Sequence, residues 1–453
     1  LSEEVTSKRR AFFYALSIVV GFAVYFLFSS LNINQRVVIA IVSVAVVLWV
    51  SEVIPLYITA LISSFLLIVL TDFSVGEVFA PYFDPVIVLF LGGFILARGI
   101  QKYDLDHYFA YSILERLGNN PYMFILGMMG ITAFLSMWMS NTASAVIMIP
   151  ICIIVLKKNK LLVGKSKFAK GAVLAVAYAA TIGGIGTLVG SPPNAIAAKY
   201  LKEGFTQSSM GLTFLGWMGK TLPFVIISLL FVWIMISLIN KPEVKRIKLA
   251  IKHPVLSKDQ KTIIIIFFIT VMGWITTGVT GLSSSTIAII PIILLFGTGL
   301  LKHEDLNKIN WGTLLLFGGG LSLGLALTKV KIDVVMGNIL SSNLAGLPQF
   351  LIIVMIVFFC IVMTMIVSNT ASAAMLIPLL LPLSATLNID LTAMAMLIAI
   401  GVSLDFMMPV GTPPNAIAYS TGLVKVKDMI KNGFVMNIGT GLILSILFYF
   451  FYI

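Results

Sequence analysis

Apolar segments of membrane-spanning length recur along this chain and constrain its fold more than any other feature. A helix that crosses the hydrocarbon core requires about 20 mostly apolar residues. Eleven segments are predicted to cross, near residues 11–30, 36–50, 55–71, 86–100, 168–190, 212–239, 262–278, 285–301, 311–328, 391–409 and 433–453. Charged residues make up 11% of the 453 positions, whereas a soluble domain carries about 25%. Since so little polar surface can face water, the sequence predicts an all-α polytopic membrane protein.

The net charge of +12 fits that prediction and does not indicate a nucleic-acid partner. In membrane proteins, basic residues gather in cytoplasmic loops and set the orientation. Cys152 and Cys360 lie inside apolar segments with no His or Cys nearby, so neither a disulfide nor a metal site is predicted. The basic residues 8–10 and the apolar run after them have the pattern of a signal peptide. No small-residue cleavage site follows, so a first transmembrane helix is predicted instead.

Two further apolar blocks do not fit as single crossings. Residues 121–157 and 350–387 are each about 37 residues long, with a Ser-Asn-Thr interruption near the middle. They are too long for one crossing and too short for two crossings with a loop, so each is predicted to be a re-entrant hairpin. Short amphipathic stretches at 104–117 and 331–343 are expected to lie along the membrane interface.

Three pairs of motifs show that the chain is duplicated. MSNTASAVIMIP at 139–150 returns as VSNTASAAMLIP 228 residues later, and GSPPNAIA at 190–197 returns as GTPPNAIA 221 residues later. FLGGFILARGI at 90–100 aligns with FGGGLSLGLAL 227 residues later. The predicted organisation is an N-terminal helix, a first repeat, a basic linker and a second repeat, with bounds 1–35, 36–240, 241–261 and 262–453.

The number of crossings between the two hairpins predicts an inverted-topology repeat. Five crossings separate Asn141 from Asn369, so the hairpins open to opposite faces of the membrane. The lysine-rich loops 157–170 and 241–261 then share a side with the basic N-terminus, and that side is predicted to be cytoplasmic. The C-terminus is predicted to be external. Lys329 and Lys331 also fall outside, against the charge rule.

Four interruptions of helical segments are expected at membrane depth, where non-helical backbone is tolerated only inside protein or beside a water-filled cavity. They are Ser140-Asn141-Thr142, Ser368-Asn369-Thr370, Gly190-Ser191-Pro192-Pro193-Asn194 and Gly411-Thr412-Pro413-Pro414-Asn415. Tandem prolines break the preceding helical turn but suit the start of a new helix, with Ser or Thr as the N-cap.

Broken helices supply ligands for ions of both signs. A restarted helix presents free N–H groups and a partial positive charge to an anion. A helix that ends presents free carbonyls, which suit a small cation, and the Ser, Thr and Asn side chains add donors and acceptors. No Lys or Arg lies in any of the four interruptions. The duplicated pattern therefore predicts two cation sites around one central anion pocket, with neutral groups holding the anion.

Other polar or unusual residues have mainly structural interpretations. A single Ser-Asn-Thr in a membrane helix usually forms a hydrogen-bonded patch between helices, but two copies at matched positions favour a site. Glu52 is interpreted as the end of a helix at the interface, whereas Asp405, six residues before Gly411, is close enough to influence a cation site. The three histidines show no ligand spacing. The glycines interpreted as close-packing surfaces are Gly92, Gly93, Gly318, Gly319 and Gly320.

The paired motifs, together with SEVIPL at 51–56, resemble the divalent anion/sodium symporter (DASS) family, which includes sodium-coupled di- and tricarboxylate transporters. The resemblance covers essentially the whole chain. It implies a homodimer with an elevator mechanism. In such a mechanism a scaffold domain forms the dimer contact, and a transport domain with both hairpins slides across the membrane with its substrate.

The resemblance also implies residue roles, taken position by position from the motifs. The first sodium site would use Ser136, Ser140, Asn141 and the carbonyl of Gly190. The second would use Thr364, the carbonyl of Val367, Asn369 and the carbonyl of Gly411. The substrate carboxylates would be bound by Ser140, Asn141, Thr142, Ser191, Ser368, Asn369, Thr370 and Thr412.

The resulting hypothesis is a secondary active transporter that carries small dicarboxylates across the cytoplasmic membrane with sodium. A sodium-independent dicarboxylate exchanger and a carrier of inorganic divalent anions such as sulfate remain alternatives. An intramembrane enzyme would need a nucleophile–base pair or a metal cluster at depth, and the sequence contains neither pattern. A channel would need a continuous polar pore lining, whereas two hairpins that close from opposite faces favour alternating access. An ATP-driven pump would need a phosphate-binding loop, and the sequence contains no such motif.

Single cysteines on either side of the membrane test the predicted topology. In a cysteine-free background, Lys165→Cys and Ser283→Cys should react with an impermeant thiol reagent from opposite sides, because three predicted crossings, an odd number, lie between them. Accessibility is measured in intact cells and in inverted vesicles. Labelling of both positions from the same side would contradict the topology.

Overall fold

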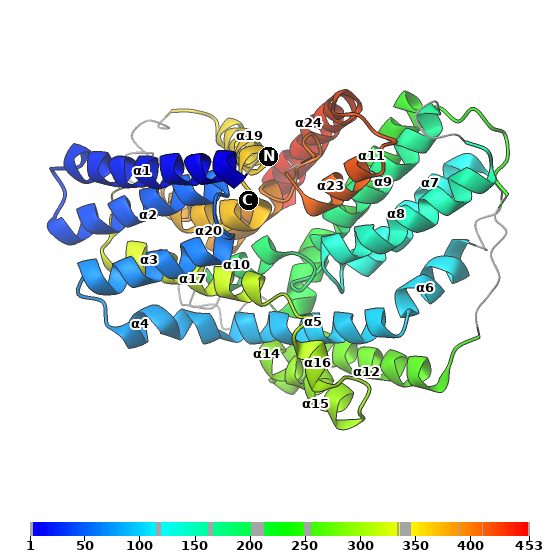
Figure 1. Ribbon diagram of the computed structural model, residues 1–453, viewed down its shortest axis with the longest axis horizontal. Coiled ribbons are helices and arrows are strands. Elements are labelled where there is room, and N and C mark those ends of the chain that lie inside the picture. The colour runs from blue at the N-terminus through cyan, green and yellow to red at the C-terminus, as the bar shows by residue number, and fades with distance from the viewer. Residues whose placement is uncertain are drawn as a thin grey trace.

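The computed structural model describes residues 3–114, 119–161, 166–200, 213–248, 255–332, 335, 346–387, 389–409 and 411–451 (Figure 1). Within these ranges every regular element is a helix and no strand occurs. The prediction of an all-helical protein is therefore confirmed. The amphipathic stretch predicted at 104–117 contains α6 (Leu105–Leu114), whereas most of the stretch predicted at 331–343 lies outside the described residues.

The other helices of the N-terminal half correspond closely to the predicted apolar segments. They are α1 (Glu3–Leu27), α2 (Ile33–Ser51), α3 (Leu56–Leu70), α4 (Val75–Phe79), the 3-10 helix η1 (Ala80–Phe83), α5 (Pro85–Lys102), α7 (Pro121–Ser136), α8 (Asn141–Lys158), α9 (Lys167–Gly184), α10 (Pro192–Tyr200) and α11 (Phe214–Ile239). Glu52 caps the C-terminus of α2 in the left-handed conformation and is exposed, as expected for the end of a helix.

The C-terminal half repeats this alternation of long helices and interrupted ones. Its helices are α12 (Lys258–Ile275), α13 (Thr277–Thr280), α14 (Ser284–Ile287), α15 (Ile289–Gly297), α16 (His303–Leu306), α17 (Trp311–Lys329), α19 (Gln349–Ile366), α20 (Asn369–Leu380), α21 (Leu383–Leu387), α22 (Leu391–Gly401), α23 (Pro413–Ser420) and α24 (Val426–Phe451). The segment predicted at 285–301 is divided between α14 and α15, and the segment predicted at 391–409 is helical only to Gly401.

Among the described residues, eight helices are long and apolar enough to cross a membrane. They lie within Lys8–Leu27, Ile33–Ser51, Val75–Lys102, Asn141–Lys158, Phe214–Ile239, Trp311–Lys329, Gln349–Ile366 and Val426–Phe451. Five shorter apolar helices accompany them. The chain is therefore a multi-pass membrane protein, as its composition predicted.

Helix α9 lies at the centre of the packing. It contacts α7, α8, α11 and α23, and every residue from Gly171 to Gly184 is buried. Its glycines and alanines let neighbouring backbones approach closely, since a Cβ on Gly183 would lie 2.4 Å from the Cα of Ala133. A helix that is apolar on all sides belongs inside a bundle. This rigid centre fixes the ends of the helices that surround it.

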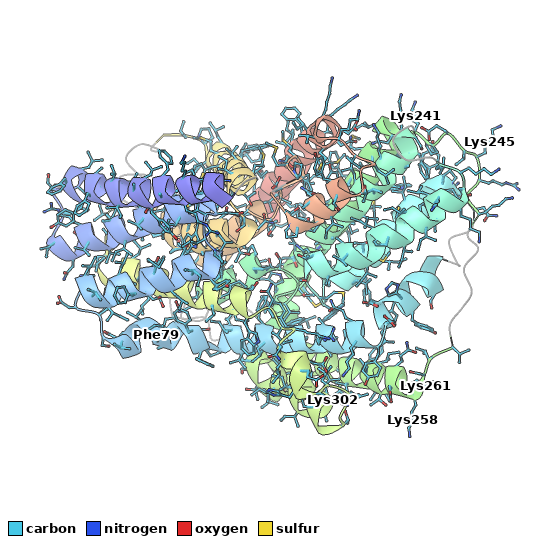
Figure 2. The ribbon with its side chains drawn as sticks, viewed as in Figure 1. Phe79, Lys241, Lys245, Lys258, Lys261 and Lys302 are labelled. Atoms are coloured by element: carbon cyan, nitrogen blue, oxygen red, sulfur yellow. The ribbon has the colours of Figure 1, made fainter. Side chains whose placement is uncertain are left out.

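The two lysine-rich loops contact each other. Asn159, after α8, exchanges hydrogen bonds with the backbone of Lys248 at 2.7 and 3.2 Å. Glu243 accepts a hydrogen bond from Ser166 Oγ at 2.8 Å. Figure 2 shows Lys241 and Lys245 beyond α11, and Lys258 and Lys261 at the start of α12, toward the same side of the view. The loops therefore gather at one end of the molecule.

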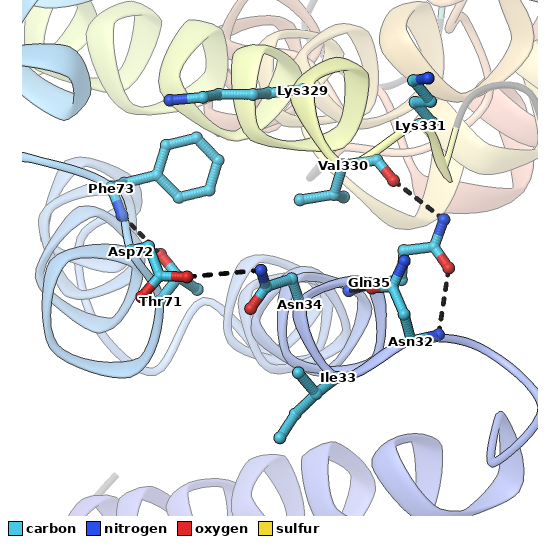
Figure 3. Close-up of a pocket in the computed structure, with 10 residues that line it drawn as sticks. All are labelled: Asn32, Ile33, Asn34, Gln35, Thr71, Asp72, Phe73, Lys329, Val330 and Lys331. Atoms are coloured by element: carbon cyan, nitrogen blue, oxygen red, sulfur yellow. Dashed lines mark hydrogen bonds between the residues drawn. The ribbon is translucent and has the colours of Figure 1, made fainter.

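Polar contacts join α2, α4 and α17 at another end (Figure 3). The Gln35 side chain donates to the carbonyl of Val330 at 2.9 Å, and Lys329 pairs with Glu77. Gln35, Lys329 and Val330 line a surface pocket of about 420 Å³, and the two contacts connect helices that are distant in sequence.

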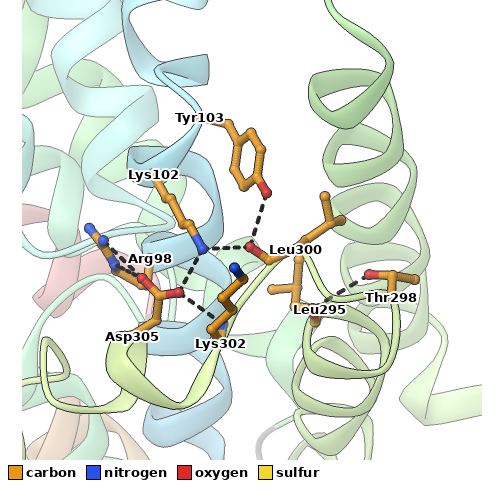
Figure 4. Close-up of polar contacts among 8 residues, drawn as sticks. All are labelled: Arg98, Lys102, Tyr103, Leu295, Thr298, Leu300, Lys302 and Asp305. Atoms are coloured by element: carbon orange, nitrogen blue, oxygen red, sulfur yellow. Dashed lines mark hydrogen bonds and ion pairs between the residues drawn. The ribbon is translucent and has the colours of Figure 1, made fainter.

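An ion-pair cluster joins α5 to α16, just before α17 begins (Figure 4). Asp305 is buried, and its carboxylate accepts from Arg98 at 3.0 Å and from Lys102 at 2.7 Å. Burial alone would raise the pKa of Asp305, but hydrogen bonds from Lys102, the Lys302 backbone and Arg98 outweigh it and hold the pKa well below its usual range. The cluster therefore holds α5 and α16 together.

Removing the Asp305 charge should destabilise the protein. Asp305→Asn removes the negative charge and replaces one of the two acceptor oxygens, which contact Arg98 and Lys102, with an NH2 group, at a cost of about 1–3 kcal/mol. Since the pKa is lowered in the folded state, the contribution is present above the unfolded pKa of about 4 and is lost as the pH falls below it. Thermal melting in detergent should show a lower midpoint for the variant at pH 7, with a difference that shrinks only as the pH falls from about 4 toward about 2.

The exposed neighbour Glu304 provides a matched control. Glu304→Gln should have the same melting midpoint as the wild type. Equal melting of Asp305→Asn and the wild type at pH 7 would show that the cluster does not stabilise this fold.

Candidate functional site

Two helix pairs are interrupted at the Ser-Asn-Thr motifs. Helix α7 ends at Ser136 and α8 begins at Asn141, while α19 ends at Ile366 and α20 begins at Asn369. Ser140 caps α8 by accepting from the Ala143 amide at 3.2 Å. Ser368 caps α20 in the same way, through the Ala371 amide at 3.4 Å. The serine of each motif thus starts a helix, and the Asn and Thr occupy its first turn.

The two Pro-Pro-Asn motifs start α10 and α23. Thr412 caps α23 by accepting from the Asn415 amide at 3.3 Å, with proline in the first turn. The Asn side chains close the preceding loops. Asn194 donates to the carbonyls of Gly184 and Thr187 at 2.9 and 2.7 Å. Asn415 likewise donates to the carbonyls of Asp405 and Met408, at 3.2 and 3.1 Å. The side-chain oxygens of both asparagines are buried without a hydrogen-bond partner.

Four oxygen atoms converge behind the first motif, where the family resemblance implies a sodium site. The Asn141 side-chain oxygen lies 2.7 Å from Ser136 Oγ and 3.2 Å from the carbonyl oxygens of Ala180 and Gly190. Ser136 Oγ also donates to Ala180 at 2.6 Å. The Ser136 hydroxyl has only one proton to donate, so the remaining oxygens require either a second donor, the amide nitrogen of a reversed Asn141, or a small cation that they coordinate.

A matching group lies behind the second motif. Thr364 Oγ1 lies 2.7 Å from the Asn369 side-chain oxygen and donates to the Val402 carbonyl at 2.6 Å. Thr364 thus takes the place of Ser136, and Val402 the place of Ala180. The carbonyl of Val367 accepts from Ser372 at 3.3 Å. Sequence reasoning missed the carbonyls of Ala180 and Val402, because a carbonyl carries no signature in the sequence.

One cavity of about 680 Å³ brings all four interruptions together. Helix α10 packs against α20, and α23 against α8, so segments from both halves meet in the middle of the molecule (Figure 1). All eight residues predicted to bind substrate line this cavity, namely Ser140, Asn141, Thr142, Ser191, Ser368, Asn369, Thr370 and Thr412. Gly190 and Gly411 also line it, whereas Ser136, Thr364 and Val367 are buried outside its lining.

The remaining walls of the cavity are partly apolar and include an acidic patch at the start of α6. Phe90, Phe94 and Leu316 form apolar parts, and no Lys or Arg belongs to the described lining. Asp104, Asp106 and His107 at the start of α6 also line it, and their ligand atoms lie within 4.8 Å of one another. The sequence analysis assigned them no role, although the Asp-Leu-Asp-His run was a signal. The helix N-termini suit an anion, and the oxygen groups suit cations.

Two solved structures of transport proteins share this fold. The chain aligns with the crystal structure of the YdaH transporter of Alcanivorax borkumensis with a TM-score of 0.61 at 13% identity, over 83% of this chain and 86% of that one. The MtrF efflux pump of Neisseria gonorrhoeae gives a TM-score of 0.59 at 13% identity, over 83% and 81% of the two chains. These likenesses concern the fold alone.

Sequence relatives are more similar. A sodium-dependent dicarboxylate transporter, SdcS, of Staphylococcus saprophyticus is 35% identical over 89% of this chain and 83% of its own length. An uncharacterized transporter of Haemophilus influenzae is 33% identical over 92% and 91% of the two chains. The model of the sodium:sulfate symporter transmembrane region matches residues 8–453. Almost the whole sequence is thus covered, and the chain belongs to the sodium:sulfate symporter family.

Proposed function

We propose that this protein is a secondary active transporter that carries small dicarboxylates across the cytoplasmic membrane together with sodium. The observation that carries the proposal is the convergence of four helix interruptions on one cavity whose described lining contains no Lys or Arg. An anion there depends on helix N-termini and neutral side chains, so bound cations are needed to supply positive charge. The sodium-dependent dicarboxylate transporter among the relatives supports the same pair of ligands.

The proposal assigns sodium to the two oxygen groups behind the motifs. The first site uses Ser136, Ser140, Asn141 and the Gly190 carbonyl, and the second uses Thr364, Val367, Asn369 and the Gly411 carbonyl. The short distances from Asn141 and Asn369 to Ser136 and Thr364 support both assignments. Oxygen ligands from side chains and unwound backbone suit a hard monovalent cation in a membrane protein.

The dicarboxylate is assigned to the cavity between the two motifs. Ser140, Asn141 and Thr142 of one half and Ser368, Asn369 and Thr370 of the other line it, with Ser191 and Thr412 beside them. Two separated groups of donors suit a molecule with two anionic ends better than a compact tetrahedral anion. Each end lies near the N-terminus of a helix, where a negative charge is stabilised.

Alternating access by an elevator movement completes the proposal. In it, α7–α8 and α19–α20 are re-entrant hairpins of an inverted repeat and belong to the moving domain. The scaffold contains α1–α6 and α12–α17 and forms a homodimer. The ion pairs Lys329–Glu77 and Lys102–Asp305 (Figure 4) join scaffold helices to one another, while Asn240–Asn432 and Lys170–Asp428 join helices of the other group. A longer pair, Lys199–Asp84 at 3.8 Å, crosses between the two groups. Four of these five contacts lie within one group, which supports two bodies that move relative to each other. The lysine-rich loops favour a cytoplasmic N-terminus and an external C-terminus.

Uptake by proteoliposomes tests the function directly. Labelled succinate should accumulate when an inward sodium gradient is imposed and should not when choline replaces sodium, because the described lining of the cavity contains no Lys or Arg. Unlabelled malate and fumarate should compete. Competition by sulfate alone would favour an inorganic divalent anion, and equal uptake without sodium would favour an exchanger.

The two kinds of side chain in each motif should have separable roles. Asn141→Ala and Asn369→Ala remove cation ligands and should raise the sodium concentration for half-maximal uptake. Thr142→Ala and Thr370→Ala remove substrate contacts worth roughly 1.5–3 kcal/mol, so the KM for succinate should rise about 10- to 100-fold. Both quantities are measured in proteoliposomes for all four variants. Unchanged sodium dependence in both Asn variants would contradict the assigned sites.

A further inference from the structure

The two halves of the site differ in charge at one pair of equivalent positions. The Asn194 side chain holds the carbonyls of residues 184 and 187, and Asn415 holds those of residues 405 and 408. Position 405 therefore has the same place in the second loop as position 184 has in the first. Position 184 is glycine, whereas position 405 is aspartate.

A side chain at this place points into the oxygen group. A Cβ built on Gly184 would lie 2.1 Å from the Asn141 side-chain oxygen and 3.0 Å from the Gly190 carbonyl oxygen. In the second half, Gly411 is the counterpart of Gly190. A Cβ built on Gly411 would lie 1.4 Å from Oδ2 of Asp405. The carboxylate thus occupies the space that the glycine leaves open, beside the backbone assigned to the second sodium site.

The carboxylate of Asp405 is buried and incompletely paired. Its side chain has no exposed surface, and Oδ1 accepts from the Met407 amide at 3.3 Å. Oδ2 has no hydrogen-bond partner, and none of the ion pairs of the described residues includes Asp405. A buried carboxylate without a counter-charge is costly, so an orphaned oxygen in such a place indicates a missing cation.

We propose that Asp405 is a ligand of the second sodium site, which therefore carries a formal negative charge while the first site is neutral. This inference rests on the sodium sites of the proposed function and adds a residue to one of them. A carboxylate oxygen is a stronger ligand for a hard cation than a neutral amide or carbonyl. The second site should therefore bind sodium more tightly than the first and fill before it.

Gly411 is part of the same arrangement. A methyl group at position 411 and the Asp405 carboxylate cannot occupy one space. Gly411→Ala should therefore displace the carboxylate and weaken sodium binding. Combining it with Asp405→Ala removes the clash but leaves a site with neutral ligands only.

Sodium binding to the purified protein without dicarboxylate tests the inference, with radioactive sodium as the probe. Asp405→Asn keeps the shape of the side chain and removes its charge. We expect the half-saturating sodium concentration of the tighter site to rise at least about tenfold, which corresponds to 1.4 kcal/mol. The control Asp72→Asn changes an exposed carboxylate (Figure 3) and should bind sodium like the wild type.

Unchanged sodium binding by a folded Asp405→Asn variant would overturn the inference and leave the proposed function intact. A wild type that binds no sodium would instead contradict the proposed function. Should Asp405→Asn fail to fold, the repacked pair Asp405→Ala with Gly411→Ala should show the same tenfold rise. The wild type gives a further readout, because sodium should change the carboxylate stretching bands in infrared difference spectra. Spectra without such a change would also overturn the inference.

Discussion

Interrupted helices inside an apolar protein are the constraint on which the rest of the structure depends. Each interruption leaves backbone N–H and C=O groups without helical partners, and these groups cannot remain unsatisfied at membrane depth. Here they are satisfied by Ser140, Ser368 and Thr412 as caps and by Asn194 and Asn415 as loop closures. The packing around α9 brings these ends to a single cavity. Three of these polar groups, the caps Ser140, Ser368 and Thr412, also line the cavity proposed to hold the ligands.

Duplication explains why the site can accept ions of both signs. Each half supplies a helix N-terminus for an anion and a group of oxygens for a cation, with Asn141 and Asn369 at equivalent points. The halves are nevertheless not chemically equal, since Gly184 faces one oxygen group and Asp405 lies at the equivalent place in the other. Two cation sites of unequal charge would fill in a fixed order, and an ordered sequence couples ions to substrate more tightly than independent binding.

The sequence predicted the helical fold, the four interruptions and the eight residues that line the cavity, because proline pairs, capping serines and duplicated motifs act locally. It did not reveal the carbonyls of Ala180 and Val402 or the partners of Asn194 and Asn415, since backbone oxygens are brought together only by tertiary packing. Asp104 and His107 were missed although their run was a signal in the sequence, because only the folded structure places that run beside the cavity. The role of Asp405 stayed open because a nearby position in sequence does not fix the direction of a side chain.

The central claim is that sodium and a dicarboxylate bind together around one cavity. Equilibrium binding of succinate to the purified protein, titrated at several sodium concentrations with choline as the replacement ion, tests it most directly. Thermodynamic linkage requires that each ligand strengthen the binding of the other by the same factor. Succinate affinity should therefore rise with sodium concentration by at least about fivefold, which is the lower end of the range for coupled sites. An affinity that does not depend on sodium would contradict it.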